Sequence, residues 1–435
     1  MKRLRKRLVG GHKKILVYFI CTILIFCNSL RASQILDFET ELLINSLINK
    51  IREANNIKYE INYIILSNND INALVDENNL IYITSGLIEN SYDYVALLSV
   101  LAHEIGHIDK NHIRQRKINN KRLKNLNSLS NLSFIAGSLI SKNDEFIKGL
   151  ALSSAASSSL YITFSKDQER EADFYSLATL KKLEQYSDSI IILLDTIKKE
   201  NLKKGLDKEK LKSGTHPYFD ERIDIVNFLN EKKENKLNLE TDKSFQFIRA
   251  KFLGYKSNIQ FIKALEDPYK SYAYAIKKAK EGDLSNSMKL INNLINLDNE
   301  NYLLLETKAD ILYSYGYTNE AVKFYKKVLK KYPNNYYTKI KVFENIELEN
   351  MSTNEIEKVF YNNLNLLNNF YNNRNILLKY YKIVKLKNDS EWINFIDYWL
   401  HKKHETKQIK EKLNNFKDTQ NKDLLNLIEI IYNDI

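Results

Sequence analysis

Residues 103–107 read His-Glu-Ile-Gly-His, an arrangement that suits metal-assisted hydrolysis. Residues four apart share one face of a helix, so the imidazoles of His103 and His107 can converge on one ion. Glu104 lies about 100° further round the helix, where its carboxylate can take a proton from an attacking water. The remaining residues of this stretch are mostly apolar, which indicates a rigid, buried helix. The pattern predicts a hydrolytic zinc site, and a core helix with two incidental histidines is the alternative.

A catalytic zinc ion needs a third protein ligand and an open fourth position. Lys110 and Ile113 stand where a metzincin would have a glycine and a third histidine, so the ligand must come from elsewhere. Glu169 is the candidate, since Glu169 and Asp173 lie four apart and share a helix face. Asp173 can then accept a hydrogen bond from a ligand histidine, for which we expect His103, and fix its ring. A solvated acidic helix face is the alternative.

Two polar residues near these segments are expected to serve other purposes. His112 follows His107 by five residues, so on a continuous helix it faces away from the two histidines. We expect it at the surface or behind the metal ligands. Glu171 lies two residues from Glu169 and is expected on another face of the helix.

Predicted helices and a small sheet must hold these residues in place. Helical periodicity marks the stretches 34–58, about 91–120, about 167–201, and one that follows His216-Pro217 and holds Arg222. The β-rich runs 60–67 and 79–84 predict one small sheet. The run 79–84 is expected to present an open edge, to which an extended peptide can add by backbone hydrogen bonds.

Residues 126–163 form two segments rich in Ser, Ala, Leu and Gly, which predict a helical hairpin. The hairpin lies between the two ligand segments in the sequence. We therefore expect it to border the site as a lid or to touch a membrane.

Beyond about residue 268 the sequence repeats with a period of 34 residues. Gly282 and Gly316 are 34 apart, and so are Ala275 and Ala309. Small residues at helix contacts with this period are typical of tetratricopeptide repeats, which bind segments of other proteins. Two repeats are clear and a third, near 336–367, is degenerate. An irregular helical bundle is the alternative.

The charge of the chain is concentrated at its start. Of a formal net charge of +12 on 435 residues, eight positive charges and no acidic residue lie in 1–32. This basic stretch, an apolar core at 15–27 and small residues after it have the layout of a secretory signal peptide, and an uncleaved membrane anchor is the alternative. Without this segment four excess charges remain, which gives no reason to expect a nucleic-acid partner.

The whole set of motifs resembles the zinc metallopeptidase family that includes HtpX and the CAAX prenyl protease. The resemblance rests on the His-Glu-Ile-Gly-His segment and on residues 169–173, which read Glu-Arg-Glu-Ala-Asp. It extends to 72–73, 80–88 and Ser165, and to Thr215-His216-Pro217 with Arg222. It covers roughly residues 34–230. A leader, this domain and C-terminal repeats together are similar to periplasmic members of the family.

The resemblance implies a role for each matching residue. His103, His107 and Glu169 match the zinc ligands, with one Zn²⁺ per chain, and Glu104 matches the catalytic acid and base. Asp173 matches the carboxylate behind the ligands. His216 and Arg222 match residues near the active site. His216 would regulate access to zinc or, with Arg222, stabilise the oxyanion, whereas a loop histidine and a salt-bridged arginine are the alternative.

The predicted fold is α+β and mostly α. A signal peptide at 1–32 precedes a gluzincin-like zinc peptidase domain at 34–230, which consists of a small sheet and active-site helices. A helical connector at 231–267 leads to an all-α solenoid of tetratricopeptide type at 268–435.

The family resemblance implies a zinc metalloendopeptidase of the periplasm, with peripheral membrane contact through the hairpin as a further expectation. It would degrade misfolded or stalled outer-membrane proteins, while the repeats bind these clients or the outer-membrane assembly machinery. Two alternatives remain open. One is a non-proteolytic chaperone or scaffold with a latent or structural zinc site, and the other is a membrane-anchored protease with an uncleaved leader.

Overall fold

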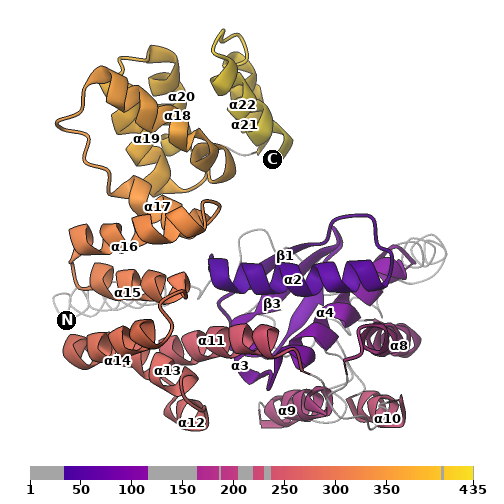
Figure 1. Ribbon diagram of the computed structural model, residues 1–435. Coiled ribbons are helices and arrows are strands. Elements are labelled where there is room, and N and C mark those ends of the chain that lie inside the picture. Colours follow the sequence, from indigo (N-terminus) through magenta and orange to yellow (C-terminus); the bar gives the residue numbers. More distant parts are fainter. Residues whose placement is uncertain are drawn as a thin grey trace, which may run out of the picture. The chain divides into compact units, whose positions relative to one another are not determined.

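The computed structural model describes residues 34–115, 164–185, 188–203, 219–229, 237–402 and 406–434 (Figure 1). They divide into two compact units, Met1–Leu253 and Gly254–Ile435. The described residues are mostly helical and include one three-stranded sheet in the first unit, so the predicted α+β, mostly α class is confirmed. The expected signal peptide and the expected hairpin at 126–163 lie outside the described residues.

The sheet of the first unit has the strand order β1-β3-β2. Strand β1 (Asn62–Leu66) is parallel to β3 (Leu80–Thr84), and β2 (Ala73–Val75) is antiparallel to β3. The expectation that the run 79–84 presents an open edge is therefore wrong, because β3 is the central strand. The chain turns back at Asp76, whose Oδ1 accepts hydrogen bonds from the N–H groups of Asn78 and Leu80, and so pairs β2 with β3.

Helix α4 (Tyr94–Asp109) carries the His-Glu-Ile-Gly-His segment and begins after Asp93, whose side chain accepts a hydrogen bond from the N–H of Ala96. The helix expected to extend to about residue 120 ends at Asp109. Lys110 is its C-cap, and Asn111 adopts the left-handed backbone conformation with φ of 57°. Asn tolerates this conformation better than most residues do. The chain after Asn111 therefore leaves the helix axis, and this changes the place of His112.

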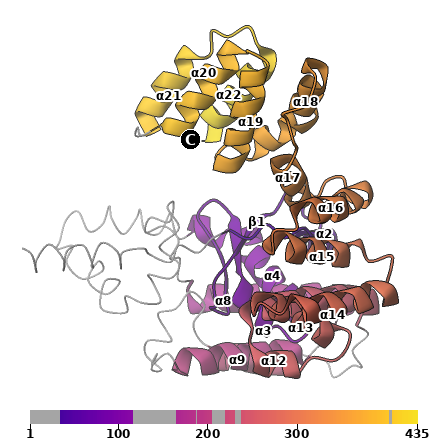
Figure 2. The ribbon, with the colours of Figure 1, turned by 90° about the vertical axis from the view of Figure 1, so that its left-hand side faces the viewer.

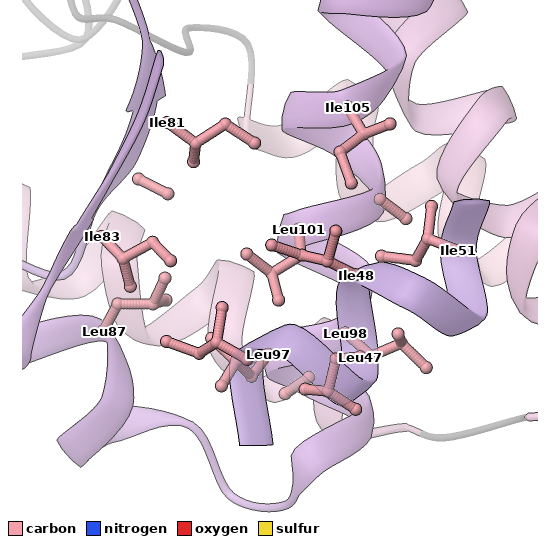
Figure 3. Packing of buried hydrophobic residues seen from close by; sticks show 14 of the residues in the cluster. Leu47, Ile48, Ile51, Ile81, Ile83, Leu87, Leu97, Leu98, Leu101 and Ile105 are labelled. Atoms are coloured by element: carbon pink, nitrogen blue, oxygen red, sulfur yellow. The ribbon is translucent and has the colours of Figure 1, made fainter. Parts of the chain in front are cut away.

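The core of the first unit fixes α4 between the sheet and α2 (Phe38–Ala54). The apolar side chains that meet there come from all three elements, and Figure 3 labels among them Ile81 and Ile83 of β3, Leu97, Leu101 and Ile105 of α4, and Leu47, Ile48 and Ile51 of α2. All are nearly or completely buried. The short helix α3 (Ser85–Asn90) joins β3 to α4. These contacts make α4 a rigid platform for the polar residues on its remaining surface.

The second ligand segment lies on α8 (Lys166–Lys182), which packs along α4. Ser165 and Gln168 form a capping box at its start. The single helix expected over 167–201 is two helices, α8 and α9 (Ser189–Lys203), because the chain turns at Glu184 with φ of 54°. Helix α10 (Phe219–Leu229) holds Arg222 and contacts both α8 and α9. Helix α11 (Leu239–Lys256) follows, and the unit boundary falls within it.

The second unit consists of helices throughout its described residues. They are α12 (Ile259–Lys263), α13 (Tyr269–Lys280), α14 (Leu284–Leu297), α15 (Tyr302–Ser314), α16 (Thr318–Lys331), α17 (Tyr336–Glu344), α18 (Thr353–Asn369), α19 (Arg374–Leu386), α20 (Ser390–His401), α21 (Thr406–Asn415) and α22 (Lys422–Asp434). The pairs α13–α14 and α15–α16 each pack side by side (Figure 2).

The two helix pairs share one turn geometry. Gly282 and Gly316 have φ values of 87° and 83°, at the same place between the helices of each pair. The backbone turn therefore repeats with the period of the sequence. Whether the pairs are tetratricopeptide repeats, and where a connector ends, stay predictions. No helix within the described ranges has the length and the apolar character that a membrane span requires.

Candidate active site

The structure brings His103 and His107 of α4 together with Glu169 of α8. The two Nε2 atoms of the histidines are 3.1 Å apart. Glu169 places Oε2 at 3.5 Å from Nε2 of His103 and Oε1 at 3.6 Å from Nε2 of His107. All three side chains are buried, and their candidate ligand atoms lie within 4.8 Å of one another. The three predicted metal ligands therefore form one compact donor cluster.

The spacing of these atoms fits a zinc ion. Two ligand atoms bound at about 2.1 Å to a tetrahedral zinc ion lie about 3.4 Å apart. The observed separations of 3.1, 3.5 and 3.6 Å surround that value. Two imidazole nitrogens and one carboxylate also make up a donor set of catalytic zinc sites, which leave a fourth position for water or substrate. The residues present could thus hold zinc.

Asp173 and Arg222 position the ring of His103 from the side opposite to the donor cluster. Nδ1 of His103 lies 2.8 Å from Oδ1 of Asp173, so it donates its proton there and presents the Nε2 lone pair to the cluster. Arg222 grips the same carboxylate with two donors, Nε at 2.9 Å from Oδ2 and Nη2 at 2.9 Å from Oδ1. Its Nη1 lies 3.8 Å from Oε2 of Glu169. The guanidinium of Arg222 therefore contacts both Asp173 and the predicted ligand Glu169.

The buried charges around His103 hold one another in their ionised forms. Burial alone would raise the pKa of Asp173, but Arg222 and His103 outweigh burial and lower it. Burial alone would lower the pKa of Arg222, but Asp173 and Glu169 raise it above its ordinary value. Burial and Arg222 disfavour the charged form of His103, yet Asp173 and Glu169 raise its pKa. Asp173 therefore remains a carboxylate that can accept the Nδ1 proton.

His107 has a different set of partners, which the sequence did not predict. Nδ1 of His107 lies 2.9 Å from Nδ1 of His112. The ring of Phe164 stacks on the ring of His107, with ring centroids 3.6 Å apart and an angle of 14° between the ring planes. His112 is fully buried, and its Nε2 lies 3.1 Å from Oε2 of Glu171. The expectation that the His112 side chain faces away from the ligands is wrong, because the turn at Asn111 brings its ring back. Of the two expected places, the surface and the position behind the metal ligands, His112 occupies the second. Asn111, one residue past the C-cap Lys110, was the available signal, because Asn can adopt the left-handed conformation that ends a helix.

The remaining predicted site residues are placed in part. Glu104 is buried on α4 beside the cluster, and its charge contributes to the raised pKa of Arg222. His216 lies outside the described residues. The contacts of Arg222 are those of a salt-bridged arginine, and its predicted role at an oxyanion stays a prediction.

The part of the chain that carries this geometry is similar to a known protein family. Residues 39–228 match peptidase family M48. A beta-barrel assembly-enhancing protease of Yersinia pestis is 25% identical over 233 residues, which are 53% of this chain and 47% of that protein. The protein of the same name from Escherichia coli K12 is 23% identical over 298 residues, 64% of this chain and 59% of that protein. The chain thus spans about half to three-fifths of the length of these relatives. Residues 39–228 hold the donor cluster and its supporting side chains, so the site lies within the part of the chain that is similar to peptidase family M48.

Proposed function

We propose that the protein is a zinc-dependent metalloendopeptidase with one zinc ion per chain, held by His103, His107 and Glu169. The observation that carries this proposal is the convergence of three buried donor atoms from α4 and α8 at distances that suit tetrahedral zinc. Glu104 follows the first ligand on the same helix, where a general base is needed. The match to peptidase family M48 supports the same reaction class.

In the proposed reaction the chain's own residues position the ligands and move one proton. Zinc bound there would act as a Lewis acid on a peptide carbonyl and activate water for attack. Glu104 would accept a proton from the attacking water and then pass it to the amine nitrogen that leaves. Asp173 and Arg222 would keep His103 in the required tautomer throughout. Two further parts of the proposal are that His216 regulates access to zinc or stabilises the oxyanion, and that Arg222 contacts the oxyanion.

We also propose a place and a substrate class for this activity. The basic and apolar leader expected at 1–32 would direct the protein to the periplasm. Relatives are named beta-barrel assembly-enhancing proteases, which supports misfolded or stalled outer-membrane proteins as substrates. The paired helices α13–α16 repeat every 34 residues and would offer a surface for these clients or for the assembly machinery. Nucleic acid is not a proposed partner.

The decisive experiment compares wild type with Glu104→Gln, in which only the proton-accepting group is lost. Zinc content is measured by elemental analysis, and cleavage is measured on casein and on an unfolded outer-membrane protein. We expect one zinc per chain in both proteins and cleavage by wild type alone, with a loss of at least about 100-fold. Equal cleavage by both proteins would refute the proposal.

If wild type binds zinc but cleaves neither substrate, a further variant, His216→Ala, is compared with it. Activity gained by His216→Ala would show a latent protease in which His216 blocks the site. If both wild type and His216→Ala bind zinc and neither cleaves, the chaperone or scaffold alternative is favoured.

A further inference from the structure

A chain of three side chains leads from a predicted zinc ligand to the surface. His107 contacts His112 through their Nδ1 atoms at 2.9 Å, and His112 contacts Oε2 of Glu171 through Nε2 at 3.1 Å. His107 and His112 are fully buried, whereas the side chain of Glu171 is 51% exposed. None of the roles described above requires His112 or Glu171.

The direction of these hydrogen bonds follows from the last residue of the chain. A carboxylate accepts only, so Nε2 of His112 must be the donor to Glu171. In a neutral imidazole the other nitrogen then carries a lone pair, so Nδ1 of His112 accepts from His107. His107 consequently keeps its proton on Nδ1 and presents an Nε2 lone pair to His103 and Glu169. This is the tautomer that a metal ligand needs.

We propose that His112 and Glu171 are positioning residues that set the tautomer and ring orientation of His107 for zinc. This inference rests on the proposed zinc site. Other contacts hold the pair itself in place. Gln168 at the start of α8 donates from Nε2 to the backbone oxygen of His112 at 3.3 Å, and Lys110 lies with Nζ at 3.9 Å from Oε1 of Glu171. Phe164 fixes the plane of the His107 ring by stacking.

The two ligand histidines are thus supported by different chemistry. His103 donates to Asp173, a buried carboxylate paired with Arg222. His107 donates to the imidazole of His112, and the carboxylate of Glu171 lies behind that imidazole, without direct contact to His107 in this chain of hydrogen bonds. Each arrangement leaves Nε2 of the histidine without a proton. Residues of α4 and α8 and the turn after α4 therefore set the tautomer of both ligand histidines, and not only that of His103.

The test measures zinc affinity by competition with a chelator of known affinity, and thermal unfolding of each metal-free protein. His112→Phe keeps a ring but has no acceptor, and His112→Asn can place its Oδ1 where Nδ1 accepts. We expect His112→Phe to bind zinc about 10- to 100-fold more weakly than wild type. His112→Asn should recover most of that loss, to within about fivefold of wild type. A packing role alone would not give this rescue, because Asn fills the site less well than Phe.

Glu171→Ala provides a second variant that changes a half-exposed position and should fold normally. We expect a loss in zinc affinity of about threefold to tenfold. Asp167→Ala is the matched control, since it removes a carboxylate from the same helix, where the side chain is 90% exposed and pairs with the exposed Arg170. It should leave zinc affinity unchanged.

Three results would overturn the inference. These are zinc affinity of His112→Phe equal to wild type, equal losses in His112→Phe and His112→Asn, and equal effects of Glu171→Ala and Asp167→Ala. Failure of wild type itself to bind zinc would be a different outcome, because it refutes the proposed function and the inference together.

Discussion

Arg222 and Asp173 form a buried ion pair in which two guanidinium nitrogens, Nε and Nη2, donate hydrogen bonds to the carboxylate. The stability it provides depends on both partners being present. A buried carboxylate without its partner costs much more than the pair contributes when intact. We expect Arg222→Met to lower the free energy of unfolding by about 3–5 kcal/mol. Urea unfolding of the zinc-free protein measures this directly, and zinc affinity should fall as well, because Asp173 no longer holds His103 in one orientation.

Two companion variants test the cause of that loss. Arg222→Lys keeps the charge but cannot form the two-pronged contact, so it should fall between wild type and Arg222→Met. Arg222→Met combined with Asp173→Asn removes the uncompensated charge and should recover part of the stability. A double variant less stable than Arg222→Met would contradict the assignment of the loss to a buried unpaired carboxylate.

At the scale of residues, the sequence predicted what depends on spacing within one helix. His103 and His107 lie four apart, as do Glu169 and Asp173, and helical geometry alone places each pair on one face. The place of His112 depends on the single backbone conformation at Asn111, which ends α4. A continuous helix was assumed there, so the predicted direction of the side chain was wrong.

Among the elements, α4 and α8 approach closely where Gly106 meets Tyr175. A Cβ atom on Gly106 would lie 3.2 Å from Cβ, Cγ and Cδ1 of Tyr175, closer than ordinary contact. The Cβ of Tyr175 is fixed to the backbone of α8 and cannot rotate away. Alanine gains up to about 1 kcal/mol in helix propensity, but overpacking costs about 1–3 kcal/mol. We expect Gly106→Ala to be destabilised by about 1 kcal/mol overall and to bind zinc more weakly.

Thermal and urea unfolding measure the first effect, and chelator competition measures the second. The same substitution in a Tyr175→Ala background should cost less, because Cγ and Cδ1 are gone. Equal costs in the two backgrounds would show that the contact with Tyr175 does not limit the approach of the helices.

The start of α2 is tied to α11 by a buried lysine. Nζ of Lys251 lies 2.8 Å from Oδ2 of Asp37 and 2.8 Å from Oε2 of Glu39. Burial alone would raise the pKa of Asp37, but Lys251 and the hydrogen bonds from Thr40 lower it below its ordinary value. A lowered folded pKa stabilises the fold above the unfolded pKa of about 3.9, and this stability is lost as the pH falls through the folded value.

Asp37→Asn should therefore be less stable than wild type by about 1.5–3 kcal/mol at pH 7. The difference should begin to shrink as the pH falls below about 4 and should disappear only below the lowered pKa of folded Asp37. Asp37 is the N-cap of α2 and accepts a hydrogen bond from the N–H of Thr40. Asparagine caps a helix about as well as aspartate, so the variant removes the charge and keeps the cap. Urea unfolding at several pH values between 3 and 7 measures the difference. A gap that stays constant over this range would exclude the ion pair as its origin.

The sheet shows why elements are harder to predict than their residues. The runs 60–67 and 79–84 are β-rich, and β1 and β3 formed within them. Strand β2 has three residues, too few for a periodic pattern, yet it pairs with β3 and makes β3 central. Strand order depends on contacts between separate segments, and local pattern carries little information about them.

For the molecule as a whole, the repeat period was readable from the sequence. The connector predicted at 231–267 contains the unit boundary, while its exact bounds stay a prediction. The 34-residue period reappears as two helix pairs with a glycine of positive φ in each turn. The unit boundary lies at Leu253–Gly254 within α11, where helical periodicity continues without a break. Each unit nevertheless has its own hydrophobic cluster, one that includes Leu101 and one that includes Trp392.

The two tryptophans of the chain, Trp392 and Trp399, both lie on α20 in the second unit, while the donor cluster for zinc lies in the first. A bound ligand stabilises the cooperative unit that binds it, by about 4 kcal/mol at a free concentration of 1,000 Kd. We therefore expect chelation of zinc to lower the calorimetric transition of the first unit by several degrees. The midpoint of tryptophan fluorescence should not change, because the core around Trp392 holds no proposed ligand. Equal shifts of both signals would show that the two cores unfold as one cooperative unit, and no shift in either signal would contradict a stabilising zinc ion at the donor cluster.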